Sequence, residues 1–245
     1  MFLRKKTAMT DYEKTALQEL RAWKKQMQQK QRLFGVLSRQ LQVRINRVIP
    51  EKVHEVITAA IKQMTRTVFT GVEFITPPAL ETSSLQERET KVESRIKFYT
   101  RTAAAEGAVT GAGGILLGLA DFPLWLMVKM KMLFEIAALY GYNTSDLKER
   151  MYLLYIFQIT FSSQGRRREI YTILKNWDQQ SGDINSFDWR KFQQEYRDYI
   201  DVAKLLQLVP GIGAPVGAVV NHRLTNKLGT SAKNAYRLRF FNGVQ

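Results

Sequence analysis

The sequence predicts an all-α protein, with one multi-helix domain built around two glycine-rich apolar segments. Apolar residues recur at helical spacing over most of the 245 residues, and no run of alternating strand pattern has a partner. The two segments, residues 107–120 and 208–220, combine apolar side chains with glycines spaced four residues apart. With 45% apolar and 24% charged residues, the chain has the composition of a protein that buries its own core.

We expect residues 1–245 to fold as a single domain, with a basic N-terminal tail at residues 1–10. The loop at residues 76–84 contains Pro77 and Pro78, which cannot continue a helix, and it is the best candidate for an internal boundary. The loop is too short to act as a flexible linker between two domains.

The N-terminal region predicts a helix that begins with a capping box, in which Thr10 and Glu13 exchange hydrogen bonds. Its inward stripe is expected to consist of Tyr12, Ala16, Leu20, Trp23 and Met27. Apolar stripes at residues 34–48 and 53–68 predict further helix, with a new start near Pro50. The opposite face of the first two stripes is rich in Lys and Arg. Such a helix either packs on its own domain or lies on a lipid surface.

A second capping box, formed by Ser84 and Glu87, predicts a helix that runs into the first glycine-rich segment. Its inward residues are expected to be Val92, Ile96, Tyr99 and Ala103. Each glycine destabilises a helix by about 1 kcal/mol relative to alanine, so the glycine pairs need a tertiary reason. Small residues at this spacing let two helix backbones approach closely. We therefore assign helix packing or membrane contact to Gly107, Gly111, Gly114, Gly118, Gly213 and Gly217.

Residues 107–128 form a window with a single charge, which raises the question of a membrane span. About 20 apolar residues suffice to cross a bilayer. However, Asp121 and Pro123 interrupt the window, and an aspartate at the centre of a span costs about 2.5–3.5 kcal/mol. We expect a buried helical hairpin or a shallow membrane insertion rather than a span.

After this break the sequence predicts a helix over residues 124–140 that ends at Gly141. Lys131 and Glu135 lie one turn apart on this helix and are expected to pair. The alternative is that the charges of this helix form a polar cluster in a cleft or against lipid.

The next helix is expected to be capped by Asn143 or Thr144 and to continue through residues 152–161. This stretch, YLLYIFQITF, is rich in strand-forming residues, but its neighbours are helical. Residues 162–165 break the pattern. Three basic residues follow, and we assign contact with an anion or a lipid headgroup to Arg166, Arg167 and Arg168. Cations near a helix start oppose the helix dipole, which favours an anionic contact there.

The last part of the chain predicts a loop at residues 181–186, a helix over residues 189–206, and then the second glycine-rich segment. The uncharged residues 208–220 are too few to span a membrane alone, so this segment is the natural packing partner of the first. A final helix is predicted from Thr230, and its outer face is expected to present Lys233, Arg237 and Arg239.

The sequence contains no complete catalytic motif. It has no phosphate-binding loop, dinucleotide fingerprint, HExxH or GxSxG. The polar residues placed near the glycine-rich segments are Asp121, Lys129, Glu135, Asn221 and His222. Buried clusters of this kind sometimes mark active sites, so a hydrolase with these catalytic residues is the alternative to a non-catalytic protein. The alternative requires Asp121 and His222 to lie within hydrogen-bonding distance.

The net charge of +15 is concentrated at the two ends of the chain. Residues 1–50 hold 12 basic and 3 acidic residues, residues 51–220 hold 20 and 19, and residues 221–245 hold 5 and 0. Cationic ends either form a solvated surface that aids solubility or favour anionic partners, and among such partners we expect an anionic membrane surface. We expect no nucleic-acid partner, because no DNA-reading motif occurs and the aromatic residues lie on core-like stripes.

The absence of cysteine and the presence of only two histidines, His54 and His222, argue against disulfides and metal sites, and we expect no cofactor. The N-terminal sequence lacks the apolar core of an export signal. We therefore expect a cytoplasmic protein that lies peripherally at the inner face of the cell membrane.

Four separated stretches carry a family resemblance. They are TGAGGILLGLADFP, LWLMVKMKMLFEIAALYGYN, ERMYLLYIFQITFSS and PGIGAPVGAVVNHRL, and a basic helix around Trp23 that leads to Val48 and Pro50 precedes them. Together they resemble the EcsC family of bacterial proteins over roughly residues 11–241, in the same order. The positions that match the family's boxes are Gly111, Gly114, Gly118, Asp121, Pro123, Lys129, Glu135, Tyr140, Gly141, Glu149, Arg150, Gly213, Gly217 and Asn221.

The resemblance implies a role beside a transporter, because the founding member of the family is encoded next to the ATPase and membrane subunits of an ABC exporter. It implies no reaction and transfers no catalytic residue. The expected function is that of a non-catalytic helical accessory protein at the cytoplasmic face of the membrane, with ABC transporter subunits as expected partners.

Overall fold

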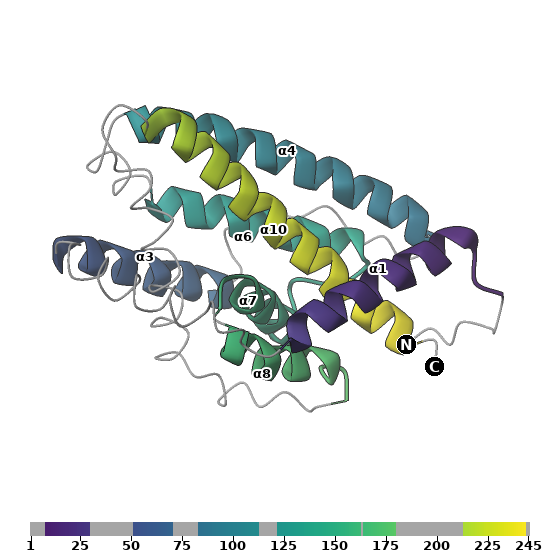
Figure 1. Ribbon diagram of the computed structural model, residues 1–245. Helices are drawn as coiled ribbons and strands as arrows, with labels where there is room; N and C mark the ends of the chain where they lie inside the picture. Colours follow the sequence, from purple (N-terminus) through teal and green to yellow (C-terminus); the bar gives the residue numbers. More distant parts are fainter. Residues whose placement is uncertain are drawn as a thin grey trace.

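The computed structural model describes residues 8–29, 51–70, 83–112, 122–162, 164–179 and 213–243. Every regular element among these residues is an α-helix, which confirms the predicted all-α class. The helices, labelled as in Figure 1, are α1 (Asp11–Gln28), α3 (Glu51–Thr70), α4 (Leu85–Ala112), α6 (Phe122–Leu139), α7 (Leu147–Phe161), α8 (Gln164–Lys175) and α10 (Gly213–Asn242).

The long helices α4 and α10 form an antiparallel pair along one side of the molecule (Figure 1). Gly107 of α4 lies against Gly217 of α10, and Glu93 of α4 lies 3.1 Å from the Nζ atom of Lys233. Gly107, late in α4, contacts the early part of α10, whereas Glu93, earlier in α4, contacts Lys233, later in α10. The two helices therefore run in opposite directions. This pair therefore joins parts of the chain that are far apart in sequence.

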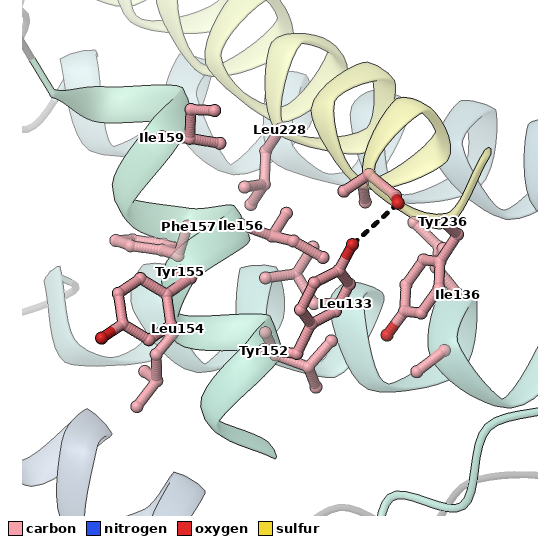
Figure 2. Packing of buried hydrophobic residues seen from close by; sticks show 14 of the residues in the cluster. Leu133, Ile136, Tyr152, Leu154, Tyr155, Ile156, Phe157, Ile159, Leu228 and Tyr236 are labelled. Carbon is pink, nitrogen blue, oxygen red and sulfur yellow. Dashed lines mark hydrogen bonds between the residues drawn. The ribbon is translucent and has the colours of Figure 1, made fainter. Parts of the chain in front are cut away.

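Helices α6 and α7 supply the centre of the core. All residues of α7 from Met151 to Phe161 are buried, and Figure 2 shows Tyr152 and Ile156 of α7 packed among side chains of α6 and α10. A helix that is apolar on every side is typical of a fully buried position. The many aromatic and β-branched residues of this stretch therefore fill a core around a helix, as the sequence predicted, rather than form a strand.

Both predicted capping boxes are present. The Thr10 hydroxyl accepts from the Glu13 N–H at 3.2 Å, and the Glu13 carboxylate accepts from the Thr10 N–H at 2.9 Å. The Glu87 carboxylate accepts from the Ser84 N–H at 2.8 Å, and the Ser84 hydroxyl accepts from the Glu87 N–H at 3.3 Å. These reciprocal bonds satisfy backbone donors that a helix start leaves without intrahelical partners.

Gly141 ends α6, as predicted. Its φ of 92° lies in the left-handed region, which favours glycine. The Tyr142 N–H donates to the Ala137 carbonyl at 3.0 Å, and the Gly141 N–H donates to the Ala138 carbonyl at 2.9 Å. This is the hydrogen-bond pattern of a Schellman motif.

The predicted start of α7 is wrong by two or three residues. Asp146, rather than Asn143 or Thr144, caps the helix, because its side chain accepts from the Lys148 N–H at 2.9 Å. Asn143 instead accepts from the Ser145 N–H at 2.9 Å and shapes the turn before the helix. Several cap-forming residues in succession made the position ambiguous in the sequence.

The predicted start of the last helix is also wrong. Helix α10 begins at Gly213 rather than near Thr230, and it is one element of 30 residues. Pro215 falls in the first turn, where its missing N–H has no intrahelical acceptor to lose. The second glycine-rich segment and the final basic helix are therefore continuous from Gly213 onward.

Where the structure describes the side chains, the predicted inward stripes are buried, except that Tyr12 is half-buried. The buried members are Ala16, Leu20, Trp23, Met27, Ile61, Met64, Val68, Val92, Ile96, Tyr99 and Ala103. None of the helices in the described ranges is long and apolar enough to cross a membrane. The predictions for residues 34–48, 76–82, 113–121, 181–186 and 189–206 lie outside the described residues.

Candidate functional site

The glycine-rich segments meet at Gly107 and Gly217. A Cβ atom on Gly107 would lie 2.4 Å from the Gly217 carbonyl oxygen and 2.7 Å from the Asn221 Nδ2 atom. Such distances are far inside van der Waals contact, so α4 and α10 approach this closely only because residue 107 has no side chain. Of the other assigned glycines, Gly111 lies in the last turn of α4 and Gly213 begins α10. Gly114 and Gly118 lie outside the described residues.

Two of the predicted polar candidates share one aromatic neighbour. The Trp125 Nε1–H of α6 donates to the Asn221 Oδ1 atom of α10 at 2.9 Å. The Lys129 Nζ atom lies 3.5 Å from the centroid of the Trp125 ring, which is the geometry of a cation–π contact. Asn221 and Lys129 are both buried, so this group fixes the start of α6 against α10.

Glu135 belongs to a different group, which joins α6 to α4. The Tyr99 hydroxyl donates to the Glu135 Oε1 atom at 2.8 Å, and the Arg95 Nε atom lies 3.4 Å from its Oε2 atom. Burial, and then the bond to Glu135, raise the pKa of Tyr99. The predicted ion pair between Lys131 and Glu135 is wrong. Lys131 is exposed, and Arg95 pairs with Glu135 instead.

The candidate catalytic residues do not gather into one site among the described residues. His222 is exposed, whereas Asn221 and Lys129 are buried and Glu135 contacts a separate part of α4. Asp121 lies outside the described residues. No group of His, Cys, Asp or Glu side chains in the described ranges could hold a metal ion.

The three arginines of the basic run differ in their surroundings. The Arg166 guanidinium pairs with Glu169 one turn later in α8. The Arg167 Nη2–H donates to the Ser162 carbonyl at 3.0 Å, at the end of α7. Arg168 is exposed. The Arg167 contact therefore joins the start of α8 to the end of α7, whereas the Arg166 pair lies within α8.

A buried ion pair that the sequence analysis missed joins α4 to α10. Glu89 is 0% exposed and Arg237 is 2% exposed. The guanidinium donates to both carboxylate oxygens, at 2.7 and 2.6 Å. The Tyr12 and Tyr140 hydroxyls donate to the same carboxylate at 2.7 and 2.8 Å, and Arg237 also donates to Glu19 at 2.6 Å. Burial would lower the pKa of Arg237, but its bonds to Glu89 raise that pKa above its ordinary value.

A second buried group lies two residues further along α10. Arg239 donates to Glu149 of α7 at 2.6 Å and to Asp178 at 2.8 Å. Its guanidinium carbon also lies 3.8 Å from the ring centroid of Tyr142. The Tyr236 hydroxyl donates to Glu149 at 2.7 Å. This group fixes the end of α10 to α7 and to the turn after α8.

These contacts correct the prediction that the C-terminal cations form an outer face. Lys233 pairs with Glu93, Arg237 with Glu89, and Arg239 with Glu149, so three basic residues of the C-terminal segment are neutralised within the protein. Glu149 and Tyr140 were among the positions that match the family, but the sequence assigned them no contact. The sequence does show that α10 has no acidic residue of its own, and this indicates that its buried cations pair with carboxylates of other helices.

Three of the four large exposed apolar side chains of the described ranges lie at the end of the molecule where the glycines meet. The large apolar residues that are exposed within the described ranges are Phe98 (54%), Val109 (67%), Leu124 (59%) and Val219 (48%). The Gly107–Gly217 contact brings the end of α4 to the start of α10, and the Trp125–Asn221 bond adds the start of α6. We call Val109, Leu124 and Val219 the apolar surface. Phe98 lies outside it, about three turns before Val109 in the middle of α4.

Exposed cations accompany the apolar surface. Arg223 lies one turn after Val219 on α10, and Lys97 and Arg101 lie about two to three turns before Val109 on α4. Apolar side chains with Lys and Arg beside them are typical of a surface that rests in the headgroup region of a membrane. Isolated exposed apolar residues are common, but the described chain places Val109, Leu124 and Val219 on three adjoining helix segments.

Comparison with known proteins identifies the family. The model of the EcsC protein family matches residues 14–241. Protein EcsC of Bacillus subtilis (strain 168) is 43% identical over 233 residues, which cover 94% of this chain and 97% of that protein. The protein YdbA of the same organism, named as uncharacterized, is 28% identical over 247 residues, which cover 91% of this chain and 90% of that protein. No solved structure matches this chain.

The matched range agrees with the family resemblance that the sequence analysis found over residues 11–241. It includes the glycine contact between α4 and α10, the buried ion pairs of α10 and the apolar surface. The chain belongs to the EcsC protein family.

Proposed function

We propose that this protein is a non-catalytic helical accessory protein that acts at the cytoplasmic face of the cell membrane, linked to an ABC exporter. The observation that carries the proposal is the apolar surface with its neighbouring cations. The link to an exporter comes from the family resemblance, since the founding member is encoded beside exporter subunits.

The apolar surface suits peripheral attachment. Burial of apolar area in the headgroup region contributes about 25 cal/mol per Å². Each nearby Lys or Arg adds about 1 kcal/mol of attraction to an anionic leaflet. Because Val109, Leu124 and Val219 stand near helix ends rather than along a long apolar helix, the attachment is shallow and reversible.

Vesicle flotation tests this proposal. The full chain is mixed with vesicles of phosphatidylcholine alone or with added phosphatidylglycerol, at low and high salt. We expect flotation that requires phosphatidylglycerol and weakens with salt, because electrostatic attraction is screened. Flotation that is absent, or that ignores both lipid charge and salt, would contradict the proposal.

Substitutions locate the contact. Val109→Glu with Val219→Glu places two carboxylates on the apolar surface, and we expect binding to weaken about tenfold or more. Both positions are exposed, so the fold should tolerate the change. Gln63→Glu with Gln86→Glu changes the net charge equally at exposed positions elsewhere, and it should leave flotation close to that of the unaltered protein.

The geometry of the described residues gives the hydrolase hypothesis no support. An exposed His222 is not paired with a buried nucleophile, and the polar candidates divide into separate structural contacts. We therefore propose no reaction for this protein.

A further inference from the structure

A second charged surface lies where α1 packs on α8. The rings of Trp23 in α1 and Tyr171 in α8 meet edge to face, with centroids 6.0 Å apart. On the solvent side of this contact, both helices carry basic residues. Their side chains are exposed, apart from the half-buried Lys24. We call these residues the cationic face, and its members are Arg21, Lys24, Lys25, Arg168 and Lys175.

Three basic residues of the cationic face, Arg21, Lys24 and Lys175, lie close enough for Lys24 to be repelled by the other two. Burial, then the charge of Lys175 and then that of Arg21, lower the pKa of Lys24. Lys24 and Lys175 belong to different helices, so the packing of α1 on α8 creates this concentration of positive charge. Repulsion between these charges costs free energy in the isolated protein. An anionic partner that binds there lowers this cost.

The acidic residues of the same elements are already paired elsewhere. Asp11 pairs with Lys14 at 2.8 Å, Glu19 with Arg237 at 2.6 Å, Glu169 with Arg166, and Asp178 with Arg239 at 2.8 Å. The ion pairs found among the described residues include no member of the cationic face. Within the described ranges, no carboxylate therefore neutralises the face.

The cationic face is remote from the apolar surface. In Figure 1, α1 and α8 lie near the end of α10. Val109, Leu124 and Val219 lie near its start, as the Gly107–Gly217 and Trp125–Asn221 contacts show. Val219 and Arg237, which contacts α1 through Glu19, are separated by about 27 Å along α10 at 1.5 Å per residue. Electrostatic screening acts over about 8 Å at physiological salt. A bilayer that covers the first turns of α6 and α10 therefore leaves the charge of the cationic face unneutralised.

The chemistry of the face favours an acidic protein segment. Its aromatic residues, Trp23 and Tyr171, are buried beneath it, so they offer no platform on which bases could stack. None of the large exposed apolar side chains of the described chain lies on α1 or α8, so lipid tails gain no contact there. Carboxylates can bond directly to Arg and Lys from two helices at once.

We propose that the cationic face binds a segment of a partner protein that is rich in Asp and Glu. The proposal is independent of membrane attachment, because the two surfaces lie at different ends of the molecule. The face would fix the protein to its partner while the apolar surface contacts lipid.

Binding of a labelled polyglutamate peptide to the full chain tests the proposal, with polyglutamine as the uncharged control peptide. Arg21→Glu with Lys175→Glu reverses two exposed charges on either side of Lys24. We expect this variant to bind polyglutamate about tenfold or more weakly, since two attractions are replaced by repulsions. Lys97→Glu with Arg101→Glu changes the net charge equally on α4, and it should change peptide affinity less than about twofold.

Other outcomes would overturn the inference. If both variants lose peptide binding equally, the peptide senses net charge rather than the cationic face. If the Arg21/Lys175 variant loses binding to phosphatidylglycerol vesicles, the face contacts lipid. If a single-stranded oligonucleotide displaces the peptide and binds more tightly, the partner is nucleic acid. Failure of the unaltered protein to bind vesicles would contradict the proposed function alone.

Discussion

Gly107 sets how closely α4 and α10 approach. In Gly107→Ala the new methyl group would meet the Gly217 backbone, which cannot turn away as a flexible side chain could. We expect the free energy of unfolding to fall by about 1–3 kcal/mol, the usual cost of overpacking. Urea unfolding monitored by circular dichroism measures the change.

Gly165 provides the matched control. It also lies in a helix, but a Cβ atom there has no neighbour within 4 Å. Gly165→Ala should therefore stabilise the protein by about 0.5 kcal/mol, because alanine restricts the unfolded chain. Equal effects of the two substitutions would mean that helix propensity, rather than the close approach, governs Gly107.

Residues that act locally could be predicted from the sequence. Thr10 and Ser84 cap helices and Gly141 ends one, because each needs partners only a few positions away. Glu89 and Arg237 could not be paired in this way, since 148 positions separate them. Many carboxylates of the chain could have formed the ion pair with Arg237, and the partner is determined only by how the helices pack.

At the scale of elements, Glu89 ties several helices together. Its carboxylate accepts from Tyr12 of α1, from Arg237 of α10 and from Tyr140 just after α6. Glu89→Leu should lower the free energy of unfolding by about 3–5 kcal/mol, because it leaves the Arg237 charge buried without this partner. Thermal and urea unfolding both report the loss.

The double variant Glu89→Leu with Arg237→Leu separates the ion pair from the packing. Removing both charges should recover at least about 1 kcal/mol relative to Glu89→Leu, because no buried charge then remains at this position. A double variant less stable than the single one would show that Arg237 contributes mainly through Glu19.

Helix existence was predictable where the apolar pattern is periodic, and helix boundaries were less so. The final helix was expected to begin near Thr230, after the glycine-rich residues 208–220. The described helix instead starts at Gly213 and carries Pro215 in a turn that tolerates it. The apolar surface was not predictable, because it depends on which helix ends meet.

At the scale of the whole molecule, buried tyrosines predict a loss of stability in alkali. Burial, together with nearby carboxylates, raises the pKa of Tyr140 and Tyr236, and burial raises that of Tyr142 to about 12. The unfolded chain ionises its phenols near pH 10. Because the folded pKa values are the higher ones, their contribution is fully present below pH 10 and is lost as the pH rises from 10 towards 12.

Tyr142→Phe isolates one of these contributions. Between pH 10 and 12 the variant should lose stability less steeply than the unaltered protein, because one fewer phenol ionises on unfolding. Urea unfolding at a series of pH values, with tyrosinate absorbance, measures both slopes. Identical slopes would mean that Tyr142 titrates normally in the folded state.

The pairing of α4 with α10 has a consequence for the order in which the protein folds as it is made. Synthesis proceeds from the N-terminus, so α4 is complete long before Gly213–Asn242 exists. Until then Glu89 and Glu149 lack Arg237 and Arg239, and α4 lacks the helix that covers it. The native core can therefore close only once α10 has left the ribosome. Until that moment the nascent chain exposes the apolar side of α4, and such a surface favours aggregation.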